Sequence, residues 1–367
     1  MATYYVDPLN GSDSNNGSSI ALAFKSTAKS ETVVVAGDTV KLLATGNESL
    51  VGTNTITLAV SGVPNNQILW QGCDMSGNTL ADGSYYTIDG SGMSSGTDVI
   101  NTAATKNRRI RNVLITNSKR FGISTTSDPA YAIIFESCSI INPATACFGT
   151  STSGIGYGFL VVNGVFTGSG SGGTQRFSYS TPGIANRSEV IPIGCLITGF
   201  NTVFSPDVAN GQQSLQNCVF ANNGSVIPAE LYAQNMSISN CLFFNNTLAI
   251  GLSDRSLAGG ARFSQITSCS FVNNTTAIAG YDTTIGSESM SFNHYYNNTT
   301  NFSGAVTSGL HDVVNVNPLF NSPGTFDFRL QSGSPLIGGG PRGTNIAGLS
   351  QVGGGGGMPL IGEGMVF

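Results

Sequence analysis

The sequence has little charge, few histidines and a single tryptophan. Charged residues make up 10% of its 367 residues, whereas hydrophobic residues make up 40%. So little charge excludes most disordered chains, which combine high charge with few hydrophobic residues. No apolar run approaches about 18 residues, so we expect no helix that spans a membrane. The net charge of −5 argues against nucleic acid as a partner.

The N-terminus also lacks a basic stretch followed by an apolar core. We therefore expect no signal peptide and synthesis in a reducing cytoplasm. Seven cysteines are an odd number, and we expect them to be unbridged thiols packed in apolar surroundings. The 48 glycines instead favour a β architecture with many tight turns.

What the sequence does contain is a repeat. Cys195, Cys218, Cys241 and Cys269 follow one another at intervals of 23, 23 and 28 residues. Such intervals are typical of solenoids, whereas the strands of a β-sandwich would recur every 8 to 12 residues or so. The copies read Asn-Cys-Val-Phe-Ala-Asn-Asn (217–223), Asn-Cys-Leu-Phe-Phe-Asn-Asn (240–246), Ser-Cys-Ser-Phe-Val-Asn-Asn (268–274) and Phe-Asn-His-Tyr-Tyr-Asn-Asn (292–298).

Each copy predicts one strand and its turns. Cysteine and phenylalanine are two residues apart, so an extended strand points both to one face. Stacking the copies about 4.8 Å apart predicts interior columns of cysteine and of phenylalanine. The paired asparagines fall at the turns, where left-handed backbone and side-chain ladders suit them. The sequence therefore predicts an all-β parallel solenoid.

The two ends carry a resemblance. Tyr4-Tyr5-Val6, Phe24-Lys25-Ser26 and Gly37-Asp38-Thr39-Val40 near the start, and residues 315–320 and 326–337 near the end, resemble proteins of the pectate-lyase-like superfamily. The resemblance implies a single-stranded right-handed parallel β-helix. We expect an N-terminal strand and cap in residues 1–35, the helix in 36–340, and a Gly-rich linker with an apolar tag in 341–367.

Four acidic residues occupy one position of the repeat. Asp207, Glu230, Asp254 and Asp282 follow the cysteine of their own copy by 12 or 13 residues, which predicts a column along one edge. Carboxylates at such spacing are near the separations that glycosidases use. Under this interpretation the four are catalytic, and Arg255 and Arg262 bind an acidic sugar. A solvated corner and a calcium site are the alternatives.

Other candidate sites are weaker. His294 and His311 lack neighbouring ligands at metal-binding spacing, so we expect packing roles, no metal site and no cofactor. Trp70 lies in an apolar strand and is expected in the core. Six basic residues within fifteen positions form either a solvated edge or a dock for an acidic partner: Lys106, Arg108, Arg109, Arg111, Lys119 and Arg120.

Two functions remain open. The fold, the acidic charge and the missing signal peptide together resemble a bacteriophage virion protein, such as a capsid decoration protein, tailspike or fibre. Our first interpretation is a non-enzymatic virion surface protein, homotrimeric, able to bind host surface polysaccharide and bound to other virion proteins through a terminus. The alternative is a polysaccharide depolymerase, either a lyase or a glycoside hydrolase. The residues expected to contact the virion partner are Met358, Leu360, Ile361, Val366 and Phe367.

Overall fold

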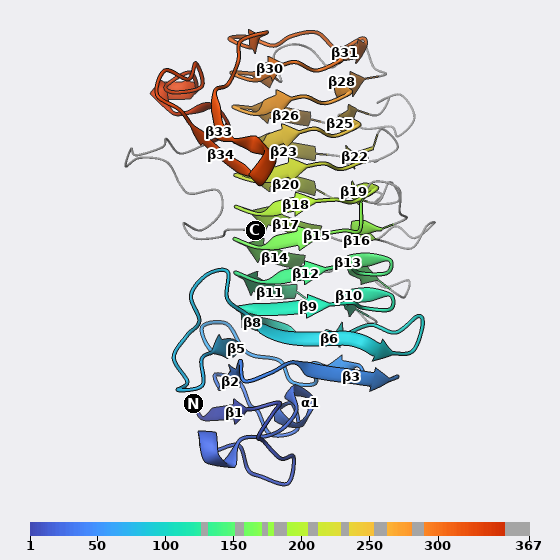
Figure 1. Cartoon of the computed structure of the whole chain (residues 1–367), viewed down its shortest axis with the longest axis vertical. Coiled ribbons are helices and arrows are strands. Elements are labelled where there is room, and N and C mark those ends of the chain that lie inside the picture. The colour runs from blue at the N-terminus through green and yellow to red at the C-terminus, as the bar shows by residue number, and fades with distance from the viewer. Residues whose placement is uncertain are drawn as a thin grey trace. The chain divides into compact units, whose positions relative to one another are not determined.

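The chain is a right-handed parallel β-helix, and this confirms the predicted fold class. The computed structural model describes residues 1–125, 131–150, 158–170, 175–179, 189–204, 212–228, 235–252, 263–280 and 290–348. Strands run through three parallel sheets, here called the first, second and third sheet, and each coil visits them in the order first, third, second (Figure 1). The chain divides into two compact units, residues 1–168 with 175–190, and residues 169–174 with 191–367.

In unit 1 each coil from β2 onward contributes one strand to each sheet, and β1 adds a further strand to the first sheet. The first sheet holds β1 (Thr3–Val6), β2 (Thr39–Leu43), β5 (Ile68–Cys73), β8 (Lys106–Arg111), β11 (Tyr131–Glu136) and β14 (Gly158–Val162). The second holds β4 (Ile56–Thr57), β7 (Ile100–Asn101), β10 (Phe121–Thr125), β13 (Ala146–Thr150) and β16 (Arg176–Tyr179). The third holds β3 (Glu48–Gly52), β6 (Tyr86–Met93), β9 (Val113–Thr116), β12 (Ser139–Ile141) and β15 (Val165–Thr167).

Unit 2 repeats this arrangement. Its first sheet holds β17 (Glu189–Ile193), of which the last three residues belong to the unit, β20 (Gln212–Gln216), β23 (Asn235–Ser239), β26 (Phe263–Thr267) and β29 (Met290–Ser291). The second holds β19 (Thr202–Phe204), β22 (Ser225–Ile227), β25 (Leu248–Leu252), β28 (Thr276–Gly280) and β31 (Thr300–Gly304). The third holds β18 (Leu196–Thr198), β21 (Val219–Ala221), β24 (Leu242–Phe244), β27 (Ser270–Val272), β30 (His294–Tyr296) and β32 (Val313–Val314).

The N-terminal residues close the first coil of unit 1. Residues 17–24 run along the free edge of β1, where the backbone N–H of Tyr5 donates to the carbonyl of Gly17 and that of Phe24 donates to Tyr5. Within residues 1–35 the chain forms one 3-10 turn, Ile20–Leu22, and one α-helical turn, α1 (Thr27–Ser30), before which the side chain of the N-cap residue Ser26 accepts from the N–H of Lys29. This covers backbone groups that an open sheet edge would expose.

The repeats of unit 2 stack as their sequence predicts. The rings of Phe220, Phe243, Phe271 and Tyr295 follow one another at 5.1, 4.9 and 5.0 Å inside the helix. The cysteines form a second buried column, and none of the chain's seven cysteines, all within the described ranges, is in a disulfide. Their thiols donate to backbone carbonyls instead, as Cys241 does to Ser239.

Asparagines lie at both turns of the repeats 217–223 and 240–246, and Ser268 and Phe292 take the first of these positions in the next two repeats. Left-handed backbone occurs at Asn217, Asn240 and Asn245 among others, with φ near +54°, a conformation that asparagine adopts more readily than most residues. Buried asparagine side chains form a ladder along the inside of the turn: the Nδ2 of Asn223 donates to the Oδ1 of Asn246, and the Nδ2 of Asn246 donates to the Oδ1 of Asn274. The polar atoms of the turn are thus satisfied from coil to coil.

A C-terminal segment covers one face of unit 2. The antiparallel pair β33 (Phe320–Ser322) and β34 (Asp327–Leu330) brings Phe328 to 5.1 Å from Phe244 of β24, ring centre to ring centre. Farther along, the N–H of Ala347 donates to the carbonyl of Ser268. The C-terminal segment therefore covers part of the outer face of the third sheet in unit 2.

Candidate functional site

The site residues named from the sequence lie outside the described residues. This applies to the acidic positions Asp207, Glu230, Asp254 and Asp282 and to Arg255 and Arg262. In chain order, each falls between a strand of the second sheet and the next strand of the first. The proposed partner-binding residues Met358, Leu360, Ile361, Val366 and Phe367 lie outside them as well. These assignments stay predictions.

The described residues contain a different candidate, on the outer face of the first sheet in unit 1. Strand register aligns Tyr5 with Lys41, Lys41 with Gln71, Gln71 with Arg111, and Arg111 with Glu136. We call these five residues the polar column. Side chains alternate between the two faces of a strand, and the neighbouring residues Val40, Trp70 and Ile110 are buried in the core. The side chains of the polar column therefore point to the outer face. At strand spacing the column extends about 19 Å along the sheet.

Two guanidinium groups meet one carboxylate in the column. The Nε and a terminal nitrogen of Arg109 donate to the Oε2 of Glu136 at 2.8 and 2.5 Å, and the Nε of Arg111 lies 3.8 Å from the same oxygen. The side chains of Arg109 and Arg111 are 44% and 36% exposed. Within the described ranges, the Nε–H of Arg111 has no hydrogen-bond partner. One carboxylate therefore leaves a net positive charge at this place, while the Nε of Arg111 itself is shielded from solvent.

The other members of the column add an ammonium group, an aromatic ring and an amide. The Nζ of Lys41 donates to the carbonyl of Gly77 at 2.8 Å and lies 5.9 Å from the ring centre of Tyr5. Gln71 is buried, and its Nε2 donates to the Oδ1 of Asn112 at 3.1 Å. Cations, a ring and an amide in a row are groups that bind sugars carrying carboxylates.

The basic cluster noted in the sequence divides among separate places. Arg108 points inward, fully buried, and pairs with the buried carboxylate of Glu31 while its guanidinium lies 5.6 Å from the ring of Trp70. Arg120 belongs to the second sheet region and donates to both oxygens of Asp98. Of the six, Arg111 belongs to the polar column, and Arg109 contacts the column through its ion pair with Glu136. The alternation of side chains along residues 106–111 is enough to predict that Arg108 and Arg109 face opposite sides of the strand. The strand register is needed to place Arg111 in one row with Lys41.

The histidines and the tryptophan have packing roles, as predicted. Trp70 is fully buried, and its indole N–H donates to Glu31. His294 is fully buried between the hydroxyl of Ser270, 2.9 Å from its Nδ1, and the carbonyl of Val316, 2.6 Å from its Nε2. Desolvation lowers the pKa of His294 to about 4. The ring of His311 stacks on Phe292 at 4.7 Å.

No cluster of three or more metal-ligating side chains occurs among the residues that the structure describes. Within the same ranges no helix is long and apolar enough to cross a membrane.

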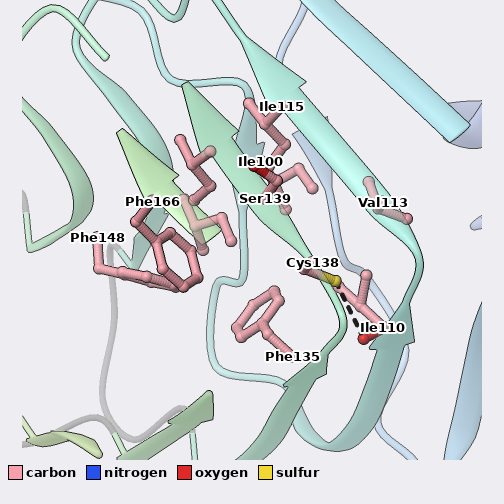
Figure 2. A pocket seen from close by; sticks show the side chains of 11 residues that line it. Ile100, Ile110, Val113, Ile115, Phe135, Cys138, Ser139, Phe148 and Phe166 are labelled. Atoms are coloured by element: carbon pink, nitrogen blue, oxygen red, sulfur yellow. Dashed lines mark hydrogen bonds between the residues drawn. The ribbon is translucent and has the colours of Figure 1, made fainter. Parts of the chain in front are cut away.

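The interior of unit 1 contains one small apolar cavity (Figure 2). Its volume is about 10 Å³, and its walls include Ile110, Phe135 and Phe148. The thiol of Cys138 donates to the carbonyl of Ile110 beside it, at 3.4 Å. A space of this size holds at most one water molecule, and its apolar walls offer that water few partners. The cavity is a packing gap that is too small for a sugar ligand.

Comparison with known proteins supports the fold. No family model matches the chain, and no curated protein matches it. Among solved structures, the pectate lyase Pel9A superposes with a TM-score of 0.64 at 16% identity, over 96% of this chain and 97% of that one. A rhamnogalacturonan lyase has a TM-score of 0.47 at 16% identity, over 81% and 74%. The GH136 lacto-N-biosidase from Eubacterium ramulus has 0.49 at 11%, over 86% and 68%. The chain is therefore similar in fold to a pectate lyase over nearly its whole length.

Proposed function

We propose that this β-helix binds an acidic polysaccharide along the polar column and degrades it. One observation carries the proposal: strand register places Tyr5, Lys41, Gln71, Arg111 and Glu136 in a single row on an outer face. A polysaccharide laid along that row would meet the partly exposed side chains of Tyr5, Lys41, Arg111 and Glu136, with the buried Gln71 between them. The fold similarity to a pectate lyase supports a polysaccharide as the ligand better than it supports a purely structural role.

The chemistry of the row favours carboxylated sugars. Arg111 offers a planar guanidinium on a side chain that is 36% exposed, and guanidinium groups bind carboxylates in a bidentate way. Lys41 adds a second cation. The ring of Tyr5 can stack on a sugar face, since aromatic side chains combine an apolar surface with a polar tip. In a chain of net charge −5, such a cationic row is a local feature.

The bond-breaking groups are a separate prediction. In this proposal the carboxylates of Asp207, Glu230, Asp254 and Asp282 supply general acid and base, and Arg255 and Arg262 bind the substrate near them. If that assignment holds, Asp254→Asn abolishes cleavage while binding along the polar column persists. Unchanged cleavage by Asp254→Asn removes the carboxylates from the mechanism without touching the binding proposal.

Turnover assays test the proposal directly. Purified protein is incubated with polygalacturonate, with alginate and with a neutral glucan, and unsaturated sugars and new reducing ends are measured separately. We expect products from an acidic polymer and none from the neutral one. Unsaturated ends identify a lyase, and saturated reducing ends identify a hydrolase. No product from either acidic polymer, together with no binding to them, contradicts the proposal.

The virion-surface interpretation is our second proposal. Its basis is the apolar segment that includes Met358, Leu360, Ile361, Val366 and Phe367 after a run of glycines. Removing residues 353–367 should abolish attachment to a particle and leave the β-helix folded. Attachment that survives the deletion argues against this role. A homotrimer would appear as three times the monomer mass in solution.

A further inference from the structure

The last coil of unit 2 is open in the described part of the chain. Strands β31 and β32 each pair with only one other described strand, β28 and β30. The far edge of each therefore presents backbone N–H and C=O groups that no described strand covers. Such edges invite pairing with another strand, and proteins cover them as a rule. In unit 1 the corresponding edge, that of β1, is covered by residues 17–24.

Apolar side chains of unit 2 also become exposed to solvent at the last coil. Register aligns Phe271, Tyr295 and Val314 in one column, and exposure rises from 0% at the two rings to 38% at Val314. Outside this column, Leu310, which pairs with Ser291, and Val316 of the same coil are 66% and 41% exposed. Ile278 is fully buried, whereas its partner Phe302 in the last coil is only partly buried. An apolar surface and an unpaired edge thus coincide.

We propose that this open end is the docking site of the chain's own C-terminal segment, residues 358–367, which adds to the last coil as an edge strand. Alternate side chains of an added strand would cover Val314, Leu310 and Val316, while its backbone pairs with the exposed edge. The segment is suited to this in composition, since it carries Met358, Leu360, Ile361, Met365, Val366 and Phe367.

The reach of the chain supports an intramolecular contact. The N–H of Ala347 donates to the carbonyl of Ser268, which lies two coils before the open end. Two coils correspond to about 10 Å. Residues 349–357 comprise nine residues, five of them consecutive glycines, and can span up to about 30 Å. A tethered segment has an effective concentration in the millimolar range, so it competes well against the same segment of another molecule.

Hydrogen exchange of the full chain and of a chain ending at Gly357 tests this. We expect the amides of β31 and β32 to exchange at least about tenfold faster in the shorter chain. Amides of β21 and β24 serve as the control for folding and should be unchanged. Equal exchange of β31 and β32 in the two chains overturns the proposal. Protection that rises with protein concentration also overturns it, because the occupant is then a second copy.

A second variant keeps the test independent of the truncation. Leu310→Ser with Val316→Ser alters only exposed side chains of the docking surface. We expect chymotrypsin to cut the full-length variant within residues 358–367 several-fold faster than it cuts the unmodified chain. A matched control is Val51→Ser, an exposed valine of unit 1, which should leave the cleavage rate unchanged. Equal cleavage rates in all three proteins contradict the docking.

Discussion

The buried asparagine ladder makes a sharp prediction about stability. The side chain of Asn246 takes part in four hydrogen bonds: its Oδ1 accepts from the backbone N–H and the Nδ2 of Asn223, and its Nδ2 donates to the carbonyl of Phe220 and to the Oδ1 of Asn274. Each such bond contributes about 1 kcal/mol. Asn246→Ala should therefore lower the free energy of unfolding by about 4 kcal/mol, and more if the buried donors of Asn223 stay unsatisfied.

The adjacent residue provides the matched control. Asn245 has a φ of 54° and makes one exposed hydrogen bond, from its Nδ2 to the Oδ1 of Asn222. Glycine adopts this backbone without strain, so Asn245→Gly should change the free energy by less than about 1 kcal/mol. Urea unfolding followed by circular dichroism measures both variants. A loss below about 1 kcal/mol for Asn246→Ala would refute the reasoning that the inner ladder holds the coils together.

Two further predictions concern buried charge. His294 titrates at a pKa of about 4 in the folded chain and 6.5 when unfolded, so the stability it contributes is complete above pH 6.5 and is lost as pH falls toward 4, by about 3 kcal/mol in all. Urea unfolding at pH 7 and at pH 4.5 should show a smaller loss for His294→Gln than for the unmodified chain; equal losses contradict this. Glu31→Gln leaves Arg108 buried without its counter-charge and should cost about 3 to 5 kcal/mol, against about 1 kcal/mol or less for Arg329→Ala at an exposed pair with Asp327, both measured by thermal unfolding. A similar loss of stability in these two variants would show that Glu31 does not compensate the buried charge of Arg108.

The sequence predicts the interior of unit 2 well because the repeat itself encodes it. The cysteine, phenylalanine and asparagine positions recur at nearly constant intervals, and strand stacking turns equal intervals into columns. The ring spacings of Phe220, Phe243 and Phe271 follow from this directly.

The polar column was missed because it has no repeat. Tyr5, Lys41, Gln71, Arg111 and Glu136 are separated by unequal intervals, and only the strand register of unit 1 aligns them. The cluster of basic residues in the sequence does not indicate the polar column, since Arg108 and Arg109 face opposite sides of one strand. The cover over the third sheet is likewise a contact between distant residues, Phe244 and Phe328, that no local pattern indicates.

The central claim is that the polar column binds an acidic polysaccharide, and the affinity of one double variant tests it most directly. Calorimetry compares oligogalacturonate binding to the unmodified chain, to Lys41→Ala with Arg111→Ala, and to Arg329→Ala as an exposed arginine outside the column. A hydrogen bond to a charged group contributes about 1.5 to 3 kcal/mol, and about 1.4 kcal/mol is a tenfold change. We predict at least a hundredfold weaker Kd for the double variant and an unchanged Kd for the control. Equal affinity of the double variant and the unmodified chain would contradict the claim.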